Sequence, residues 1–157
     1  MTGKKSNNST STVLVVDDNP QNLELLLAYL EDLDCETTSA TDGTEALEKA
    51  KQISPDLILL DVMMPKMSGF EVCRRLKIDP GTADIPIIMV TALSELGDIE
   101  RAIDSGTDDF LSKPVNKLEL ITRVKTMLKL KHLTDKLERT LAYLSEVESQ
   151  VEIGNDD

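Results

Sequence analysis

Several residue types are scarce in this chain of 157 residues, and each scarcity argues against a class of protein. The only histidine is His132, which argues against histidine-based catalysis or a histidine-rich metal site. Cys35 and Cys73 lie far apart without a CxxC motif, so neither a disulfide framework nor a structural zinc site is expected. Aromatic residues make up only 3% of the chain, which argues against a platform for stacking bases.

Long apolar runs and positive charge are also lacking. No run approaches the roughly 18 apolar residues of a membrane span. Residues 1–12 are polar and lack the apolar centre of a signal peptide, so we expect a cytoplasmic protein with no membrane partner. A net charge of −12 argues against nucleic-acid binding. What remains is an acidic globular chain that is rich in carboxylates.

Short apolar runs separated by helical segments predict the fold. Runs that are apolar on both faces are typical of buried parallel strands, and they cover 13–16, 57–60, 85–90 and, more weakly, 109–111. A more polar run at 35–40 is typical of an edge strand. Strand and helix alternate five times, which predicts an α/β fold with an open, doubly wound, five-stranded parallel sheet.

Helix starts and stops can be read from local signals. Asn19 and Pro20 open the first helix, since proline is favoured at the first helical position. The fourth helix begins near residue 96 and is expected to end before Gly106, a C-terminal cap. Three further helices begin at residues that precede a glutamate by three positions, the capping-box spacing: Asp42, Ser68 and Asn116.

The last helix is unusually long. From Lys117 no glycine or proline occurs before Gly154, so the helix would span about 35 residues and ~50 Å. Leucine and valine recur along it at a mean interval of 3.5, the coiled-coil period, at positions 130, 133, 137, 141, 144, 147 and 151. This pattern favours a parallel dimeric coiled coil. The alternatives are a helix that folds back on its own domain and a remnant of a longer chain.

Acidic, hydroxyl and basic side chains follow the carboxyl ends of the strands, where open parallel sheets bind ligands. Asp17 and Asp18 follow the first strand, Asp61 the third, Thr91 the fourth and Lys113 the fifth. Three converging carboxylates repel one another, and a hard cation such as Mg²⁺ relieves that repulsion. A lysine and a threonine hydroxyl are suited to phosphoryl oxygens. The pattern therefore predicts a metal-dependent phosphoryl site.

The order and spacing of these motifs resemble the receiver domain of bacterial two-component response regulators. The resemblance covers about residues 12–130, and it implies the flavodoxin-like strand order 2-1-3-4-5. Each motif is common alone, whereas the set is specific: Val-Val-Asp17-Asp18-Asn-Pro, Leu-Leu-Asp61-Val-Met-Met-Pro65, Val-Thr91-Ala92 and Phe110-Leu-Ser-Lys113-Pro114.

The resemblance implies a metal-assisted phosphoacceptor in a phosphorelay. Asp61 would take a phosphoryl group from a sensor histidine kinase or a phosphotransfer protein, forming an aspartyl phosphate. Asp61, Asp18 and the backbone carbonyl of Met63 would bind Mg²⁺ directly, with Mn²⁺ as the alternative ion. Asp17 would act mainly through bound water. The domain would be a signalling phosphoacceptor rather than an enzyme.

The resemblance also implies a switch. Lys113 would pair with a phosphoryl oxygen, and its bond to Pro114 is expected to be cis. Thr91 would move its hydroxyl onto the phosphoryl group, and Phe110 would rotate into the space it leaves. This movement would change the surface around the fourth helix, the fifth strand and the fifth helix.

Two apolar residues beside the site suggest a long-lived signal. Met63 lies two residues after the acceptor, and Leu93 lies two residues after Thr91. Polar side chains at these positions can orient a hydrolytic water, whereas methionine and leucine exclude it. We therefore expect slow self-dephosphorylation.

Four segments are expected along the chain: a disordered leader at 1–11, the receiver at 12–130, a helical coiled-coil extension at 131–153 and a disordered tail at 154–157. The stretch from Val115 to Leu133 resembles receivers joined to cyclic-dinucleotide enzymes or regulatory phosphatases more than DNA-binding regulators. The effector would be a separate or missing domain, and the helix would carry a homodimer.

Two rival functions come from other classes. One is a Mg²⁺-dependent phosphohydrolase that acts through an aspartyl phosphate. Such enzymes usually place a second aspartate two residues after the nucleophile, where this chain has Met63. The other is a constitutive coiled-coil scaffold, which would leave the complete acidic set without a purpose.

Overall fold

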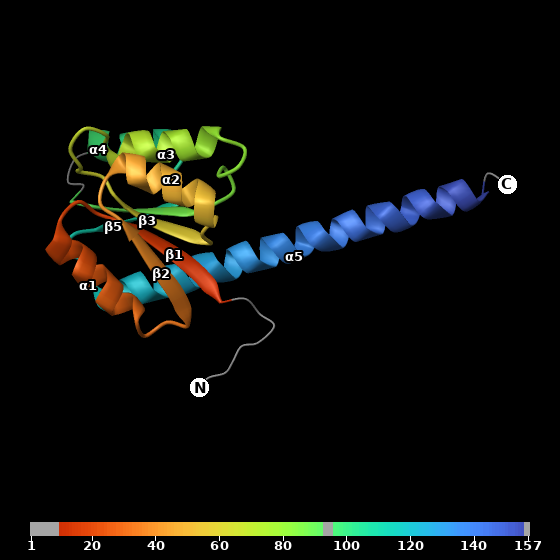
Figure 1. Ribbon diagram of the computed structural model, residues 1–157, viewed down its shortest axis with the longest axis horizontal. Helices are drawn as coiled ribbons and strands as arrows, with labels where there is room; N and C mark the ends of the chain where they lie inside the picture. Colours follow the sequence, from red (N-terminus) through yellow and green to blue (C-terminus); the bar gives the residue numbers. More distant parts are fainter. Residues whose placement is uncertain (1–9, 93–95, 156–157) are drawn as a thin grey trace.

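A central sheet with helices on both faces carries one helix that projects far beyond it (Figure 1). The computed structural model describes residues 10–92 and 96–155. The strands are β1 (Ser11–Val16), β2 (Cys35–Ala40), β3 (Leu57–Asp61), β4 (Ile87–Thr91) and β5 (Asp109–Ser112). The helices are α1 (Pro20–Leu30), α2 (Gly43–Ile53), α3 (Gly69–Ile78), α4 (Leu96–Asp104) and α5 (Lys117–Asn155).

The sheet confirms the predicted architecture. Its five strands are all parallel and follow the order β2-β1-β3-β4-β5. The polar strand β2 lies at one edge, as its sequence predicted, and the three most apolar strands lie inside. All carboxyl ends therefore meet at one edge of the sheet, the left-hand side of Figure 1.

Alternate residues of each inner strand enter two separate cores, because side chains alternate across a strand. Leu14, Ile58 and Leu60 pack with apolar residues of α2, α3 and α4 on one face. Val15 and Leu59 pack with α1 and the first turns of α5 on the other face. The receiver-like part of the chain is thus a three-layer α/β unit.

The helix caps predicted from the sequence form as expected. The side chain of Asn19 accepts hydrogen bonds from the backbone N–H groups of Gln21 and Asn22. Three other cap side chains accept a hydrogen bond from the N–H three residues later: Asp42, Ser68 and Asn116. Gly106, after α4, has a φ of 93°, the left-handed region that suits glycine.

The ends of several elements differ by one or two residues from the sequence-based bounds. β4 starts at Ile87 rather than 85, since Pro86 has no N–H to donate to a neighbouring strand. β1 includes Ser11, the last residue of the expected leader, because Ser11 pairs with Cys35. α5 continues to Asn155, past the expected end at residue 153. A glycine inside a helix costs only about 1 kcal/mol, so Gly154 does not have to end it.

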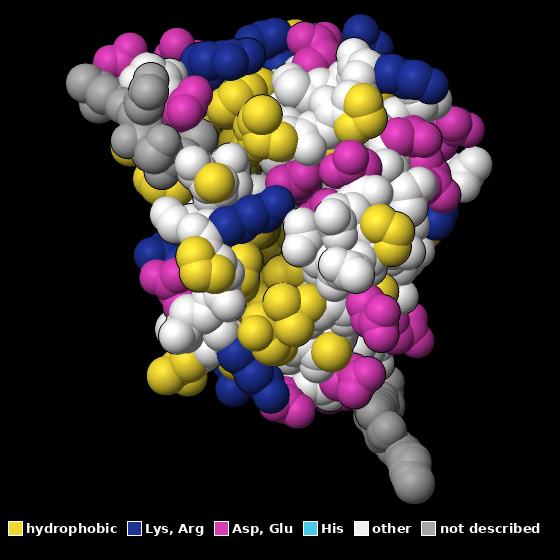
Figure 2. Space-filling view, turned by 90° about the vertical axis from the view of Figure 1, so that its left-hand side faces the viewer, with side chains coloured by type: hydrophobic (Ala, Val, Ile, Leu, Met, Phe, Trp, Pro, Cys, Tyr) yellow, Lys and Arg dark blue, Asp and Glu magenta, His cyan; other side chains and the backbone are white. Residues whose placement is uncertain are grey.

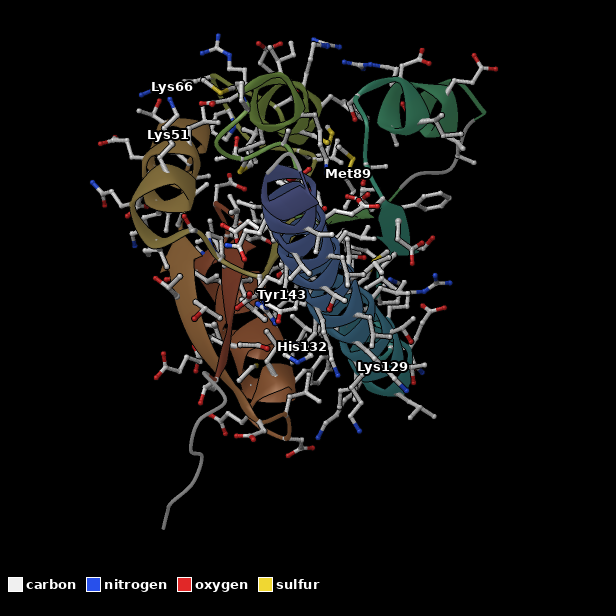
Figure 3. All side chains as sticks on the ribbon, turned by 90° about the vertical axis from the view of Figure 1, so that its right-hand side faces the viewer. Lys51, Lys66, Met89, Lys129, His132 and Tyr143 are labelled. Carbon is white, nitrogen blue, oxygen red and sulfur yellow. The ribbon has the colours of Figure 1, made fainter. Side chains whose placement is uncertain are left out.

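α5 changes its surroundings along its length. Leu120 and Val124 are fully buried against the sheet. From Leu130 to Val151 the leucine and valine side chains are exposed, and the helix runs away from the domain (Figure 1). Lys129, His132 and Tyr143 are likewise exposed on this helix, which points toward the viewer in Figure 3. In the described residues no helix is long and apolar enough to cross a membrane.

Candidate phosphoacceptor site

The predicted site residues meet at the carboxyl edge of the sheet. Asp61 is the last residue of β3 and Thr91 the last of β4, while Asp17 directly follows β1 and Lys113 directly follows β5. Asp17, Asp61 and Thr91 are buried, and Lys113 is half-buried. Figure 2 looks at this edge, where acidic side chains lie beside a basic one near the centre of the face.

Lys113 links the end of β5 to the carboxylate of Asp61. Its Nζ donates a hydrogen bond to Oδ1 of Asp61 at 2.9 Å, and it lies 4.0 Å from Oδ2 of Asp17. Its backbone N–H donates to the carbonyl of Thr91 at 2.9 Å, which ties the loop after β5 to the end of β4. The peptide bond to Pro114 is cis, as the family resemblance implied.

The carboxylates fit a hard cation. One oxygen from each of Asp17, Asp18 and Asp61 lies within 4.8 Å of the others. Oδ1 of Asp17 accepts a hydrogen bond from the N–H of Asn19 at 2.9 Å. Its Oδ2 is buried and finds no hydrogen-bond partner among the described residues. A buried carboxylate oxygen without a donor is costly, and a divalent cation bound by oxygen ligands would satisfy it.

Burial dominates the electrostatics of the site. Desolvation raises the pKa of the Asp61 carboxyl, although its hydrogen bond to Lys113 acts in the opposite direction. Desolvation also raises the pKa of Asp17, against the hydrogen bond from Asn19 and with the help of the neighbouring negative charge of Asp61. Ionisation of these buried carboxyl groups therefore costs free energy in the metal-free site, and a bound cation would offset that cost.

Sequence reasoning missed Gly69, which sets the position of the acceptor. A Cβ at this residue would lie 2.3 Å from the backbone oxygen of Asp61 and 2.7 Å from the Cα of Val62. The first turn of α3 therefore presses directly on the end of β3, and only glycine fits. A glycine at the first helical position was the available signal, because alanine would be a better helix former there.

The remaining predicted residues border the site in different ways. The side chain of Met63 is 74% exposed. Phe110 is half-buried and packs against the core beneath α2, α3 and α4. Leu93 lies outside the described residues. His132 and the two cysteines lie elsewhere, with Cys73 buried and Cys35 half-buried.

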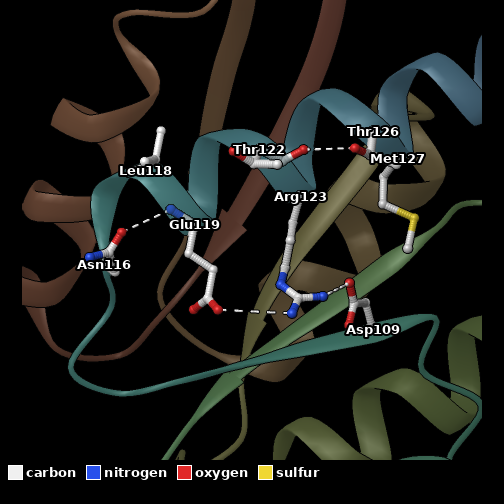
Figure 4. Close-up of a pocket in the computed structure, with 8 residues that line it drawn as sticks. All are labelled: Asp109, Asn116, Leu118, Glu119, Thr122, Arg123, Thr126 and Met127. Carbon is white, nitrogen blue, oxygen red and sulfur yellow. Dashed lines mark hydrogen bonds and ion pairs between the residues drawn. The ribbon is translucent and has the colours of Figure 1, made fainter.

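A cleft beside the site lies between α1, the end of β4 and the loop that follows β5. It has a volume of about 240 Å³ and is mostly apolar, with Asp17 and Lys113 at its edge. A second groove of about 660 Å³ lies along α5 beside β5 (Figure 4). There Arg123 pairs with Asp109 at 2.6 Å.

The strand order, the three carboxylates and the lysine define a class of protein. It comprises the flavodoxin-like α/β domains with an acidic phosphoryl site at the carboxyl edge of the sheet.

The chain belongs to the response regulator receiver domain family, whose profile matches residues 13–125. It is 45% identical over 130 residues to the response regulator PleD of Caulobacter vibrioides, which covers 83% of this chain and 29% of PleD. It is 43% identical over 117 residues to the DNA-binding dual master transcriptional regulator RpaA of Synechocystis, which covers 74% of this chain and 48% of RpaA. The chain thus spans less than half the length of these two relatives.

Solved receiver domains share the fold. The signal receiver domain of a histidine kinase from Syntrophus aciditrophicus is 38% identical, with a TM-score of 0.73 over 76% of this chain and 91% of that one. The receiver domain of the sensor histidine kinase PA1611 from Pseudomonas aeruginosa is 30% identical, with a TM-score of 0.72 over 77% of this chain and 99% of that one. The latter structure has a magnesium ion coordinated in its active site cleft.

Proposed function

We propose that this chain is a phosphoacceptor that receives a phosphoryl group on Asp61 from a histidine kinase or a phosphotransfer protein. One arrangement carries the proposal. Lys113 holds a buried Asp61 at 2.9 Å beside two further aspartates, and one of these has a buried oxygen that accepts no hydrogen bond from the described residues. Receiver domains are signalling phosphoacceptors, so turnover of exogenous phosphoesters is not expected.

The residues of the site would divide the chemistry among them. An oxygen of Asp61 attacks phosphorus, and the phosphorus–nitrogen bond of the donor histidine breaks, leaving its electron pair on the imidazole. Lys113 pairs with a phosphoryl oxygen, and the Thr91 hydroxyl donates to another. Asp17, Asp18, Asp61 and the backbone carbonyl of Met63 would hold Mg²⁺. The bound ion would neutralise charge on the incoming group.

Phosphorylation would act on the output surface through Thr91 and Phe110. When Thr91 turns toward the phosphoryl group, the half-buried ring of Phe110 gains room to rotate inward. These two movements would shift the equilibrium between two conformations of the surface formed by α4, β5 and α5. The apolar side chain of Met63 offers no group to orient water, which supports slow loss of the phosphoryl group.

The extension would carry the output as a homodimer. Seven leucine and valine side chains of α5 are at least 37% exposed between residues 130 and 151 and repeat with the coiled-coil period. A single helix that exposes such a stripe would gain stability by pairing with another. The partner effector would be a separate protein or a further domain.

The direct test is the intact mass of the protein after incubation with acetyl phosphate and Mg²⁺. We expect one added phosphoryl group in the wild type and none in Asp61→Asn. Asp34→Asn, which removes an exposed carboxylate far from the site, is the matched control and should be modified like the wild type. Modification that persists in Asp61→Asn would refute the assignment of the acceptor.

Omitting Mg²⁺ tests the role of the ion in the same assay. We expect modification of the wild type to fall by at least an order of magnitude, since the transition-state charge would then lack its cation. Replacing Mg²⁺ with Mn²⁺ tests whether the site accepts the alternative ion.

A further inference from the structure

The exposed seam of α5 has residue types that bear on how two copies would pair. Residues seven apart share one position of a heptad, and residues three further on share the facing position. The first set, position a, is Leu130, Leu137, Leu144 and Val151. The second set, position d, is Leu133, Thr140 and Val147, while Leu141, the remaining exposed leucine of the stripe, stands beside it at position e.

These residue types do not suit a parallel two-stranded coil. Parallel dimers are favoured by β-branched residues at a and leucine at d. Here the pattern is inverted: position a holds leucine at three of its four sites, while the β-branched residues Thr140 and Val147 stand at d. In a parallel pair each a or d residue would pack against the same residue of the second chain, in the geometry that its residue type does not favour.

Charge along α5 points the same way. Residues 117–139 carry seven basic and three acidic side chains, whereas residues 140–157 carry five acidic side chains and no basic one. A parallel pair would set the two net-basic halves beside each other and the two acidic halves beside each other. Reversing one helix would instead set the basic half of each copy beside the acidic half of the other, which favours association.

We infer that the seam pairs with a second copy of this chain in the antiparallel orientation, an inference that rests on the proposed homodimer. In an antiparallel pair, a positions pack against d positions of the other helix. The register that uses most of the seam sets Leu130 against Val147, Leu133 against Leu144, and Leu137 against Thr140 of the second copy. Each of these three layers combines a leucine with an equal or smaller residue, and the pair is centred between residues 138 and 139.

This register also agrees with the charge distribution along α5 and with the position of the groove beside β5. The segment 129–131, which carries two lysines, stands at the level of segment 146–148 of the second copy, which carries two glutamates. Val151 of the second copy reaches the level of Thr126, which lines the groove beside β5 shown in Figure 4. That groove lies on the same side of α5 as the seam, since Thr126 is four residues before Leu130. The receiver therefore leaves room for the end of the second helix.

Disulfide formation between single cysteines tests the orientation in the full chain. The background is Cys35→Ser with Cys73→Ala, and diamide is the oxidant. Leu130→Cys and Val147→Cys are oxidised separately and as a mixture that was combined in the reduced state. We expect linked dimers in the mixture, where the two thiols face each other, and at most one tenth as much in either variant alone. Leu118→Cys, exposed on α5 but off the seam, should not cross-link.

The outcomes separate the orientation from the dimer itself. Efficient linking of Leu130→Cys with itself would overturn the antiparallel inference and leave the proposed homodimer standing. Light scattering at micromolar concentration supplies the second arm. A monomeric mass would refute both, while a trimeric or tetrameric mass, or a dimer that links in none of these variants, would refute the antiparallel pair.

Discussion

The first turns of α5 and the rest of the same helix differ in the burial of their apolar side chains. The first turns of α5 bury Leu120 and Val124 completely against the sheet, while Leu137, further along the same helix, is 58% exposed. Both parts have apolar side chains at helical spacing. The difference teaches that a periodic apolar stripe predicts a contact, and that the tertiary surroundings determine whether that contact is made within the chain or with another one.

Matched leucine truncations should give the largest contrast between these regions. Leu59→Ala in β3 removes a fully buried side chain, and the lost packing should cost about 2–5 kcal/mol in the free energy of unfolding. Leu137→Ala should change receiver unfolding by less than about 0.5 kcal/mol, the usual range for exposed positions. Urea denaturation at low protein concentration, where the proposed dimer dissociates, measures both. Equal losses would erase the distinction between receiver and extension.

A pair of glycines sharpens the comparison inside the receiver. Gly69→Ala forces a Cβ against the backbone of β3, and overpacking of this kind should cost about 1–3 kcal/mol. Because the clash is with Asp61 itself, modification by acetyl phosphate should also slow. At Gly97 in α4 a Cβ would meet nothing within 4 Å, so Gly97→Ala should be neutral or stabilise the helix by up to about 1 kcal/mol. Thermal unfolding compares the two, and a neutral Gly69→Ala would contradict the tight contact.

The smallest expected effect concerns the buried carboxylate of Asp17. Burial raises the pKa of Asp17 above its ordinary value of 3.8, so the folded state binds this proton more tightly than the unfolded state. Without metal, wild-type stability should therefore fall as the pH rises from that value through the raised pKa. Asp17→Asn removes this loss, so its melting temperature should exceed that of the wild type by a few degrees at neutral pH and differ little in acid.

Mg²⁺ should reverse the order of the two melting temperatures, so that the wild type melts above Asp17→Asn. The wild type gains stability by binding the ion, while Asp17→Asn gains less. Asp34→Asn is the control for removing a negative charge and should respond to Mg²⁺ as the wild type does. If Asp17→Asn were stabilised by Mg²⁺ as strongly as the wild type, Asp17 would have no part in the metal site.

Local rules made much of the fold predictable. The strands 13–16, 35–40 and 57–60 were found because β-branched and aliphatic runs have few other uses in a parallel α/β domain. The caps at Asn19, Asp42 and Ser68 were found because their hydrogen bonds span at most three residues. The meeting of Asp17, Asp61, Thr91 and Lys113 at one edge of the sheet was predictable, because parallel strands bring their carboxyl ends together whatever the sequence between them.

Features that depend on distant contacts could not be read in this way. Three such features arise only when separate elements are packed together. They are the close approach of Gly69 to Asp61, the buried oxygen of Asp17 that accepts no hydrogen bond from the described residues, and the groove beside Arg123. The C-terminal end of α5 was predicted two residues too early for another reason. Gly154 opposes helix only weakly, so it did not end the helix at residue 153.

The central claim is that chemistry belongs to the receiver and pairing to the extension, and one measurement tests it most directly. A seam variant with Leu137→Asp and Leu144→Asp is incubated with acetyl phosphate and Mg²⁺, and its intact mass is compared with that of the wild type. We predict the same single added phosphoryl group in both, together with a monomeric mass for the variant by light scattering. Loss of modification in the seam variant, with its receiver still folded, would contradict the account.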